Sequence, residues 1–137
     1  MTYRVLATDP LDQQGVDVFT AKPEIQLDLK PGMKPDELAR VIGEYDALVI
    51  RSGSKVTADT LKNHGKLRVI GRAGIGVDNV DIPAASRRGI IVMNTPFGNS
   101  ITTAEHAIAL MFALARQIPE ANAQTQQGMW PKNGFMG

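Results

Sequence analysis

The chain of 137 residues is 43% hydrophobic and 21% charged, the balance of a globular domain with a sizeable core. Fifteen basic residues oppose fourteen acidic ones, and the net charge of +1 argues against nucleic-acid or membrane-surface partners, which usually require a basic surplus. The absence of cysteine excludes disulfides and thiolate metal sites and is typical of a cytoplasmic protein. No segment approaches the ~20 apolar residues of a membrane span.

Residues 1–99 alternate short apolar segments with amphipathic ones. The short segments are rich in β-branched residues and are bounded by turn residues, which predicts strands at residues 4–8, 25–29, 47–50, 67–70 and 90–93. Apolar residues at helical spacing predict helices between them, at residues 11–21, 34–45, 57–64 and 81–88. Thr57 is a good N-cap for the third of these helices.

The regular alternation of strand and helix predicts a parallel sheet built by right-handed crossovers. The segments A-L-V-I (47–50) and L-R-V-I (67–70) are too apolar for a sheet that faces water on one side, so helices should cover both faces. The strand at 25–29 alternates apolar and polar residues, which favours an edge position. We therefore expect a flavodoxin-like α/β domain over residues 1–99.

A different element is expected at residues 101–118, a single long helix. Thr102 and Glu105 have capping-box spacing, and Pro119 supplies a stop. Apolar residues occupy most of the helix surface, so a second domain or a second copy of the chain should bury it on more than one side. Residues 120–137 are polar and predict no complete element, and we treat 100–137 as a separate segment.

A glycine-rich loop, G-R-A-G-I-G-V-D-N at residues 71–79, follows the fourth expected strand. A dinucleotide fingerprint requires G-x-G-x-x-G at the start of a helix. Gly74 and Gly76 supply the first two glycines, but Asn79 stands where the third belongs, so the fingerprint is broken. The chain also contains no G-x-x-x-x-G-K-[ST] phosphate loop.

The same loop can bind an anion in another way. Gly74 and Gly76 can expose consecutive backbone N–H groups at the carboxyl edge of the sheet, where open α/β folds bind ligands. Arg51 and Arg72 should emerge at this edge, and guanidinium groups match carboxylates and phosphates. The motif alone leaves open the alternative that the glycines serve only a turn and the arginines are solvated.

Few other residues in the sequence indicate a catalytic or ligand-binding role. Asp9 ends the first strand, as in receiver domains, but Arg51 stands where a receiver needs an aspartate, which excludes that class. His64 lies near a turn and His106 lies on the long helix, where lone histidines usually serve packing or face solvent. The sequence therefore assigns no catalytic residue and no metal site.

Longer motifs carry a resemblance to a known family. They are L-R-V-I-G-R-A-G-I-G-V-D-N-V-D (67–81), N-T-P-F-G-N-S (94–100), D-A-L-V-I-R-S-G-S-K-V-T (46–57) and W-P-K-N-G-F-M-G (130–137). Together with A-E-H-A-I-A-L-M-F-A-L-A-R-Q-I-P (104–119), they resemble the D-2-hydroxyacid dehydrogenases. The combination favours the branch of that family that acts on phosphoglycerate.

The resemblance implies a two-domain, NAD-dependent enzyme whose first domain is the flavodoxin-like substrate domain. The long helix would cross to a Rossmann domain and help to form a dimer. The loop amides would hold the substrate carboxylate, and Ile75 would also lie beside the nicotinamide end of the cofactor. The substrate-binding residues that the resemblance implies are Arg51, Ser52, Arg72, Ala73, Gly74, Ile75, Gly76 and Asn99.

The resemblance also places the cofactor fingerprint and the family's catalytic arginine, glutamate and histidine beyond residue 137, and His106 does not match that histidine. We therefore expect a substrate-binding fragment of an NAD-dependent enzyme that oxidises 3-phosphoglycerate in serine biosynthesis. The fragment should be inactive alone, without tight NAD binding. Its expected partners are a small anionic substrate, the missing Rossmann domain and a second copy through helix 101–118. The alternative is a stand-alone anion-binding or dimerisation module without enzyme activity.

Overall fold

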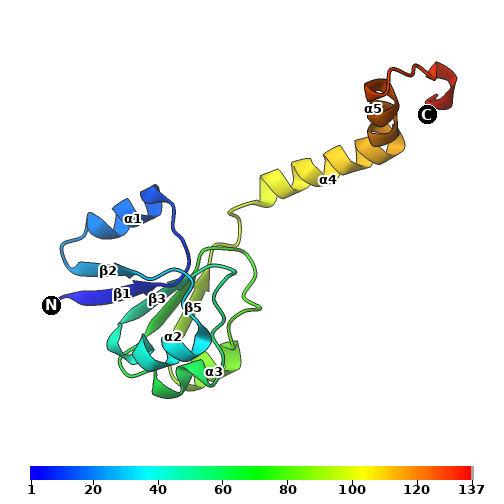
Figure 1. The fold of residues 1–137 in the computed structure, drawn as a ribbon. Helices are drawn as coiled ribbons and strands as arrows, with labels where there is room; N and C mark the ends of the chain where they lie inside the picture. The colour runs from blue at the N-terminus through cyan, green and yellow to red at the C-terminus, as the bar shows by residue number, and fades with distance from the viewer. Residues whose placement is uncertain (137) are drawn as a thin grey trace. The chain divides into compact units, whose positions relative to one another are not determined.

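A computed structural model describes residues 1–136, and the chain divides into two units, Met1–Gly98 and Asn99–Gly137. The first unit contains a five-stranded parallel sheet with the order β2-β1-β3-β4-β5 (Figure 1). Its strands are β1 (Tyr3–Ala7), β2 (Ile25–Leu29), β3 (Ala47–Ile50), β4 (Val69–Arg72) and β5 (Ile91–Asn94). This is the flavodoxin-like order, with β2 at an edge, so the expected α/β sheet is confirmed.

Short helices connect the strands. They are α1 (Gln13–Thr20), α2 (Pro35–Val41) and α3 (Ile82–Arg87), with 3₁₀ turns η1 (Ile42–Glu44) and η2 (Thr60–Asn63). The carboxylate of Asp12 caps α1 by accepting the Gln14 N–H at 3.0 Å. The carboxylate of Asp81 caps α3 by accepting the Ala84 N–H at 2.9 Å. In each of these two helices, a local side chain therefore satisfies one of the four N–H groups that lack an intrahelical partner.

Two predicted helices are shorter and tighter than expected. The helix expected at 34–45 ends in η1, and the helix expected at 57–64 is the 3₁₀ turn η2. The two turns pack closely, because a Cβ atom built on Gly43 would lie 2.5 Å from the Asn63 carbonyl oxygen. Thr57 is not the N-cap of η2, because Asp59 takes that position, but its Oγ1 still accepts the Thr60 N–H at 3.3 Å.

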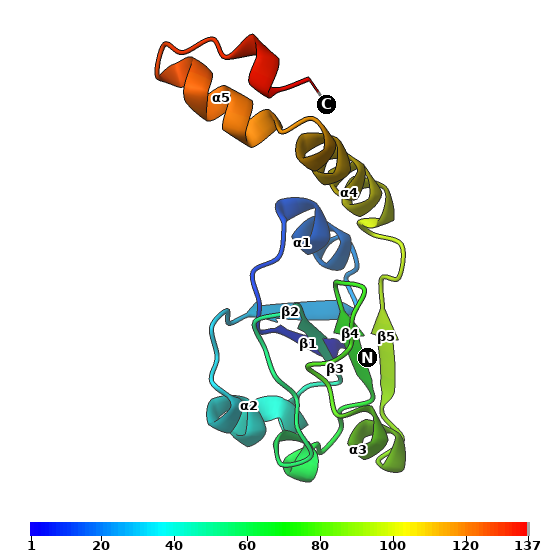
Figure 2. The same ribbon diagram turned by 90° about the vertical axis from the view of Figure 1, so that its right-hand side faces the viewer.

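The helices divide unequally between the two faces of the sheet. Figure 2 shows α2 and α3 on one face and α1 on the other. The connection from β1 to β2 runs toward one edge of the sheet, and all later connections run toward the other edge. Because each crossover is right-handed, α1 lies on one face and the later helices lie on the opposite face. The core lies on the crowded face, where it comprises Leu6, Leu38, Ile42, Tyr45, Leu48, Ile50, Val56, Leu61, Leu67, Ile70, Val80, Ala84, Ala85 and Ile90.

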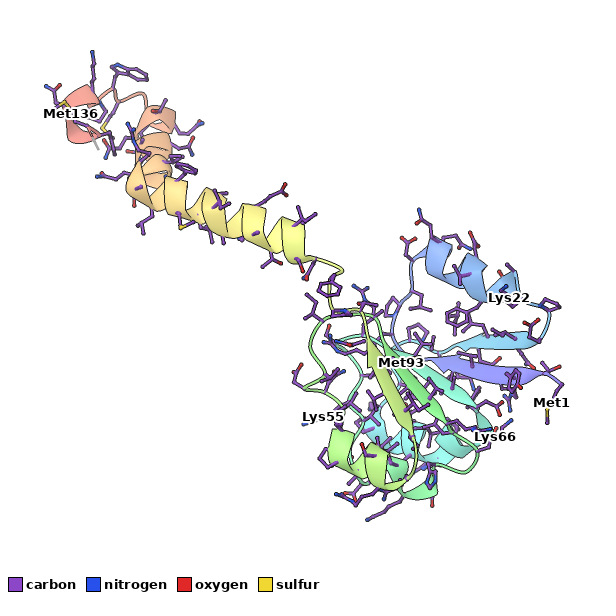
Figure 3. The ribbon with its side chains drawn as sticks, turned by 180° about the vertical axis from the view of Figure 1, so that it is seen from behind. Met1, Lys22, Lys55, Lys66, Met93 and Met136 are labelled. Atoms are coloured by element: carbon purple, nitrogen blue, oxygen red, sulfur yellow. The ribbon has the colours of Figure 1, made fainter. Side chains whose placement is uncertain are left out.

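The face that carries α1 is covered only in part by the first unit. Ile91 and Met93 on β5 remain 60% and 53% exposed (Met93 is labelled in Figure 3). An apolar groove of about 480 Å³ lies beside α1, with Phe19, Val49 and Met93 among its lining residues. The expectation that helices cover both faces is therefore wrong for this part of the described unit, which lacks a second helix on this face.

The second unit contains α4 (Ser100–Ala115), α5 (Ile118–Gln126) and the 3₁₀ turn η3 (Lys132–Gly134). The prediction of one helix over 101–118 is wrong, because Gln117 takes a left-handed conformation with φ of 51° and interrupts it. Pro119 lies in the first turn of α5, where its missing N–H costs no hydrogen bond. The prediction of no complete element after residue 119 is wrong for the same reason.

No residue of α4 is buried. Asn99 is its N-cap residue, and Thr102 lies inside the helix and donates to the Asn99 carbonyl at 3.0 Å, so the expected capping box does not form. The exposed large apolar side chains of α4 are Ile101, Ile108, Leu110, Met111, Phe112 and Leu114. The burial expected from its composition does not come from the described residues. None of the described helices has the length and apolarity to cross a membrane.

A cluster of polar side chains links β1, β2 and the segment that precedes β3. The buried Tyr45 hydroxyl donates to Asp28 Oδ2 at 2.8 Å, and Arg4 Nη2 donates to the same oxygen at 3.0 Å. The Arg4 guanidinium carbon lies 4.5 Å from the centre of the Tyr45 ring, within cation–π range. The hydrogen bond from Tyr45, followed by that from Arg4, lowers the pKa of Asp28 below its ordinary value of 3.8.

We expect Tyr45→Phe to lower the free energy of unfolding at pH 7 by about 1.5–3 kcal/mol, since it removes a hydrogen bond to a charged group. A lowered pKa contributes stability above the unfolded pKa and loses it as the pH falls through the folded pKa. The deficit of the variant should therefore shrink below pH 3.8. Urea unfolding at pH 7 and pH 3 measures both effects. Tyr3→Phe is the control, because Tyr3 is 49% exposed. A deficit that is equal at both pH values would contradict the assignment.

Candidate functional site

Three chain segments leave the sheet side by side at its carboxyl edge. Ile50 at the end of β3 pairs with Arg72 at the end of β4, and Arg72 pairs with Asn94 at the end of β5. The 51–54 loop, the 73–80 loop and the chain after β5 therefore start at the same level of the sheet. This is the edge at which open α/β sheets bind ligands, as the sequence predicted.

The strand β4 ends later than expected, at Arg72 instead of Ile70, so Gly71 and Arg72 belong to the sheet. Both neighbours of β4 extend far enough to pair with these residues, and the pairing with Ile50 and Asn94 continues the ladder. The glycine-rich loop therefore begins at Ala73. The side chain of Arg72 therefore projects from a strand, whose backbone is fixed by its neighbours, rather than from a loop.

The loop amides differ in their availability to a ligand. The Ala73 N–H donates to the Ile50 carbonyl at 2.8 Å, and the Gly74 N–H donates to the Arg72 carbonyl at 2.9 Å. Among residues 1–136, the N–H groups of Ile75 and Gly76 form no hydrogen bond to a backbone acceptor. The geometry therefore favours Ile75 and Gly76 as donors to an anion. The predicted contacts from Ala73 and Gly74 stay predictions.

The glycines of the loop provide space rather than left-handed backbone. Neither Gly74 nor Gly76 has a positive φ. A Cβ atom on Gly74 would collide with Nη1 of Arg72, and one on Gly76 would lie 2.8 Å from Oδ1 of Asp78. The absence of a side chain at position 74 thus lets the Arg72 guanidinium lie against the loop.

Asn79 joins Arg72 to the neighbouring loop. Nε of Arg72 donates to Oδ1 of Asn79 at 2.8 Å. Nδ2 of Asn79 donates to the carbonyl oxygens of Arg51 at 2.7 Å and Ser54 at 2.6 Å. Sequence reasoning treated Asn79 only as the residue that breaks a fingerprint and missed this role. Its side chain is half-buried between two loops, a position that depends on tertiary structure.

Asp9 holds the 51–54 loop from the opposite side. Its Oδ2 accepts the N–H of Arg51 at 2.6 Å and the N–H of Ser54 at 3.1 Å. Thr8 and Ser54 share a hydrogen bond between their hydroxyls at 2.7 Å. Asp9 as a whole residue is 7% exposed, so this contact is largely shielded from water. Sequence reasoning noticed Asp9 but assigned it no function once the receiver class was excluded.

The end of β5 fixes the other side of the glycine-rich loop. Nδ2 of Asn94 donates to the Ile75 carbonyl at 2.7 Å, and the Thr95 N–H donates to the Gly74 carbonyl at 3.0 Å. With these carbonyls engaged, the amides of Ile75 and Gly76 keep a defined position at the edge.

The remaining predicted residues lie in different settings. The side chains of Arg51 and Ser52 are exposed at the edge, and Ile75 is 42% exposed. Asn99 belongs to the second unit, so its expected proximity to the substrate stays a prediction. Nδ1 of His64 lies 3.1 Å from the Leu61 carbonyl in η2, and His106 is exposed on α4. No cluster of three metal-ligating side chains occurs within residues 1–136.

Comparisons with known proteins give a consistent result. Residues 5–130 match the family described as D-isomer specific 2-hydroxyacid dehydrogenase, catalytic domain. A D-3-phosphoglycerate dehydrogenase of Synechocystis is 46% identical over 134 residues, which are 98% of this chain and 24% of the relative. The chain therefore spans about a quarter of the length of this relative.

Solved structures agree with the sequence comparison. A protein of Pyrococcus horikoshii OT3 superimposes with a TM-score of 0.84 at 25% identity, covering 99% of this chain and 40% of the other. The NAD⁺-bound 3-phosphoglycerate dehydrogenase of Entamoeba histolytica superimposes with a TM-score of 0.72 at 27% identity, covering 85% and 40%. The fold of the chain is thus shared with at least one solved dehydrogenase.

Proposed function

Because the chain belongs to the family of D-isomer specific 2-hydroxyacid dehydrogenases, we propose that it is the substrate-binding part of an NAD-dependent phosphoglycerate dehydrogenase. The observation that carries this proposal is the arrangement at the carboxyl edge. Two free loop amides, from Ile75 and Gly76, lie in the loop that directly follows Arg72, whose guanidinium lies against it. Amides and guanidinium together suit a ligand that carries a carboxylate and a phosphate.

Each group has a distinct role in this proposal. The N–H groups of Ile75 and Gly76 hold the substrate carboxylate, which orients the neighbouring C2 carbon. Arg72 and the exposed Arg51 neutralise the phosphate, with Arg72 held more firmly because its Nε is already bonded to Asn79. Ser52 and Asn99 complete the proposed contacts. The apolar side chain of Ile75 bounds the site on the side proposed for the nicotinamide.

The described residues do not themselves fit a dinucleotide. Asn79 occupies the position of the third fingerprint glycine, and its side chain ties the loop to a neighbouring loop instead of opening a helix onto a phosphate. In the whole enzyme, NAD would accept the hydride when 3-phosphoglycerate is oxidised to the 2-keto acid. We place its binding in a Rossmann domain outside this chain, in a cytoplasmic enzyme of serine biosynthesis.

We expect Arg72→Ala in the full-length protein to raise KM for 3-phosphoglycerate by a factor equivalent to about 1.5–3 kcal/mol, the range for a charge-assisted hydrogen bond. Steady-state kinetics with NAD measures the change. Arg68→Ala is a matched control, because Arg68 is exposed and immediately precedes β4, at the opposite end from Arg72. An unchanged KM in Arg72→Ala would show that Arg72 does not contact the substrate.

We expect the 137-residue chain alone to show no NAD-dependent oxidation of 3-phosphoglycerate, because its only G-x-G sequence lacks the third glycine of the fingerprint. Absorbance at the NADH band, recorded with purified chain and both substrates, checks this. The full-length protein under the same conditions is the positive control. Turnover by the short chain that scales with its concentration would refute the assignment of a substrate-binding part.

The exposed apolar surface of α4 favours a second role, association with another copy through this helix. Contiguous exposed apolar side chains usually mark an interaction site. Leu110, Met111 and Phe112 are 57%, 62% and 63% exposed in the single chain. The same surface supports the alternative function, a stand-alone dimerisation module without enzyme activity.

We expect the chain to dimerise and Leu110→Lys to weaken the dimer about tenfold or more, because burying a leucine contributes about 1.5–3 kcal/mol. Sedimentation over a range of concentrations gives the dissociation constants. Val18→Lys is the control, since Val18 is 66% exposed on α1 in the other unit. A wild-type chain that stays monomeric throughout would remove both dimerisation proposals.

A further inference from the structure

We propose that Asn79 is a positioning residue, which ties the Arg72 guanidinium to the 51–54 loop. It thereby fixes the position of Arg72 relative to Arg51, the other arginine of the anion site. This inference rests on the proposed function. The observation behind it is one side chain with three hydrogen bonds to two segments, at 2.8, 2.7 and 2.6 Å.

The chemistry of the three partners requires an amide at position 79. Arginine has only donors, so Oδ1 of Asn79 must face Nε of Arg72. The carbonyls of Arg51 and Ser54 have only acceptors, so Nδ2 must face them. An aspartate could accept from Arg72 but could not donate to the two carbonyls, and an aliphatic residue could do neither.

The 51–54 loop is held at both of its ends by two opposed side chains. Asp9 accepts the N–H groups of Arg51 and Ser54, and Asn79 donates to the carbonyl oxygens of the same two residues. The backbone polar groups of both residues are therefore bonded, while the side chain of Arg51 stays exposed. Asp9 fixes the loop to β1, and Asn79 fixes it to the loop after β4.

The backbone of Asn79 is also anchored. Its carbonyl accepts the Val56 N–H at 2.8 Å, and Val56 and Val80 form a parallel bridge. The backbone that carries the side-chain amide of Asn79 is therefore held in place. Because Nε of Arg72 is bonded to it, the guanidinium plane is set, and Nη1 and Nη2 remain for a ligand. A prearranged guanidinium loses less conformational freedom when it binds.

The test uses the 137-residue chain and NMR, with Asn79→Ala, Asn79→Asp and the control Asn63→Ala, whose side chain is exposed in η2. The wild type should show a hydrogen-bonded Nε–H signal of Arg72. Asn79→Ala should lose it, Asn79→Asp should keep it, and both should shift the backbone amides of residues 51–54. Asn63→Ala should change neither.

The ligand arm of the test is a titration with 3-phosphoglycerate. We expect Asn79→Ala to weaken binding about two- to tenfold, the effect of one ordinary hydrogen bond. Asn79→Ala added to Arg72→Ala should weaken binding by less than the product of the two single effects, because the two residues act through one guanidinium. A residue with a general structural role would instead give independent effects.

The outcomes separate this inference from the proposed function. An unchanged Arg72 Nε–H signal in folded Asn79→Ala overturns the inference, as does unchanged affinity in Asn79→Ala when Arg72→Ala weakens binding. If Asn79→Ala does not fold, the amide shifts of 51–54 in Asn79→Asp decide the same question. If 3-phosphoglycerate perturbs none of Arg51, Arg72, Ile75 and Gly76 in the wild type, the proposed function fails, and the Nε–H signal still decides the role of Asn79.

Discussion

The pairing of β4 between β3 and β5 is the constraint on which the candidate site depends. Because Ile50, Arg72 and Asn94 lie level in one ladder, three loops begin at one height and can bond to one another. Arg72 is the last residue of its strand, so its backbone is fixed by two neighbours before its side chain reaches the loop. The site is therefore built on the sheet, which is the most rigid support that this fold provides.

The broken fingerprint has a physical explanation in the fold. In a dinucleotide-binding loop, the third glycine allows close packing of a helix on the strand. Here no helix starts until α3, and the residue at that position supplies an amide to three partners instead. Gly74 leaves room for the Arg72 guanidinium rather than for a pyrophosphate. Similar glycine spacing thus serves a different ligand chemistry.

Strand positions were predictable from the sequence because short segments that are rich in β-branched residues and bounded by turn residues are typical of strands. The alternation of elements predicted a parallel, doubly wound sheet with right-handed crossovers, but it does not by itself separate the order 2-1-3-4-5 from the other common order, 3-2-1-4-5-6. The break at Gln117 was not predictable, because no local breaker marks it and Pro119 suits a helix start as well as a stop. The contacts of Asp9 and Asn79 join residues 42 and 28 positions away in the chain, so no local pattern reveals them.

The two edges of the sheet differ in how they are protected. The β2 edge carries Asp28 inside the strand and is followed by Lys30, and charges of this kind discourage another strand from pairing. The β5 edge, I-V-M-N, carries no charge and exposes Ile91 and Met93. An uncharged open edge is a template for strands of other molecules. Concentrated solutions of the first unit should therefore aggregate by edge-to-edge pairing at β5, and a lysine placed in that strand would act as a gatekeeper.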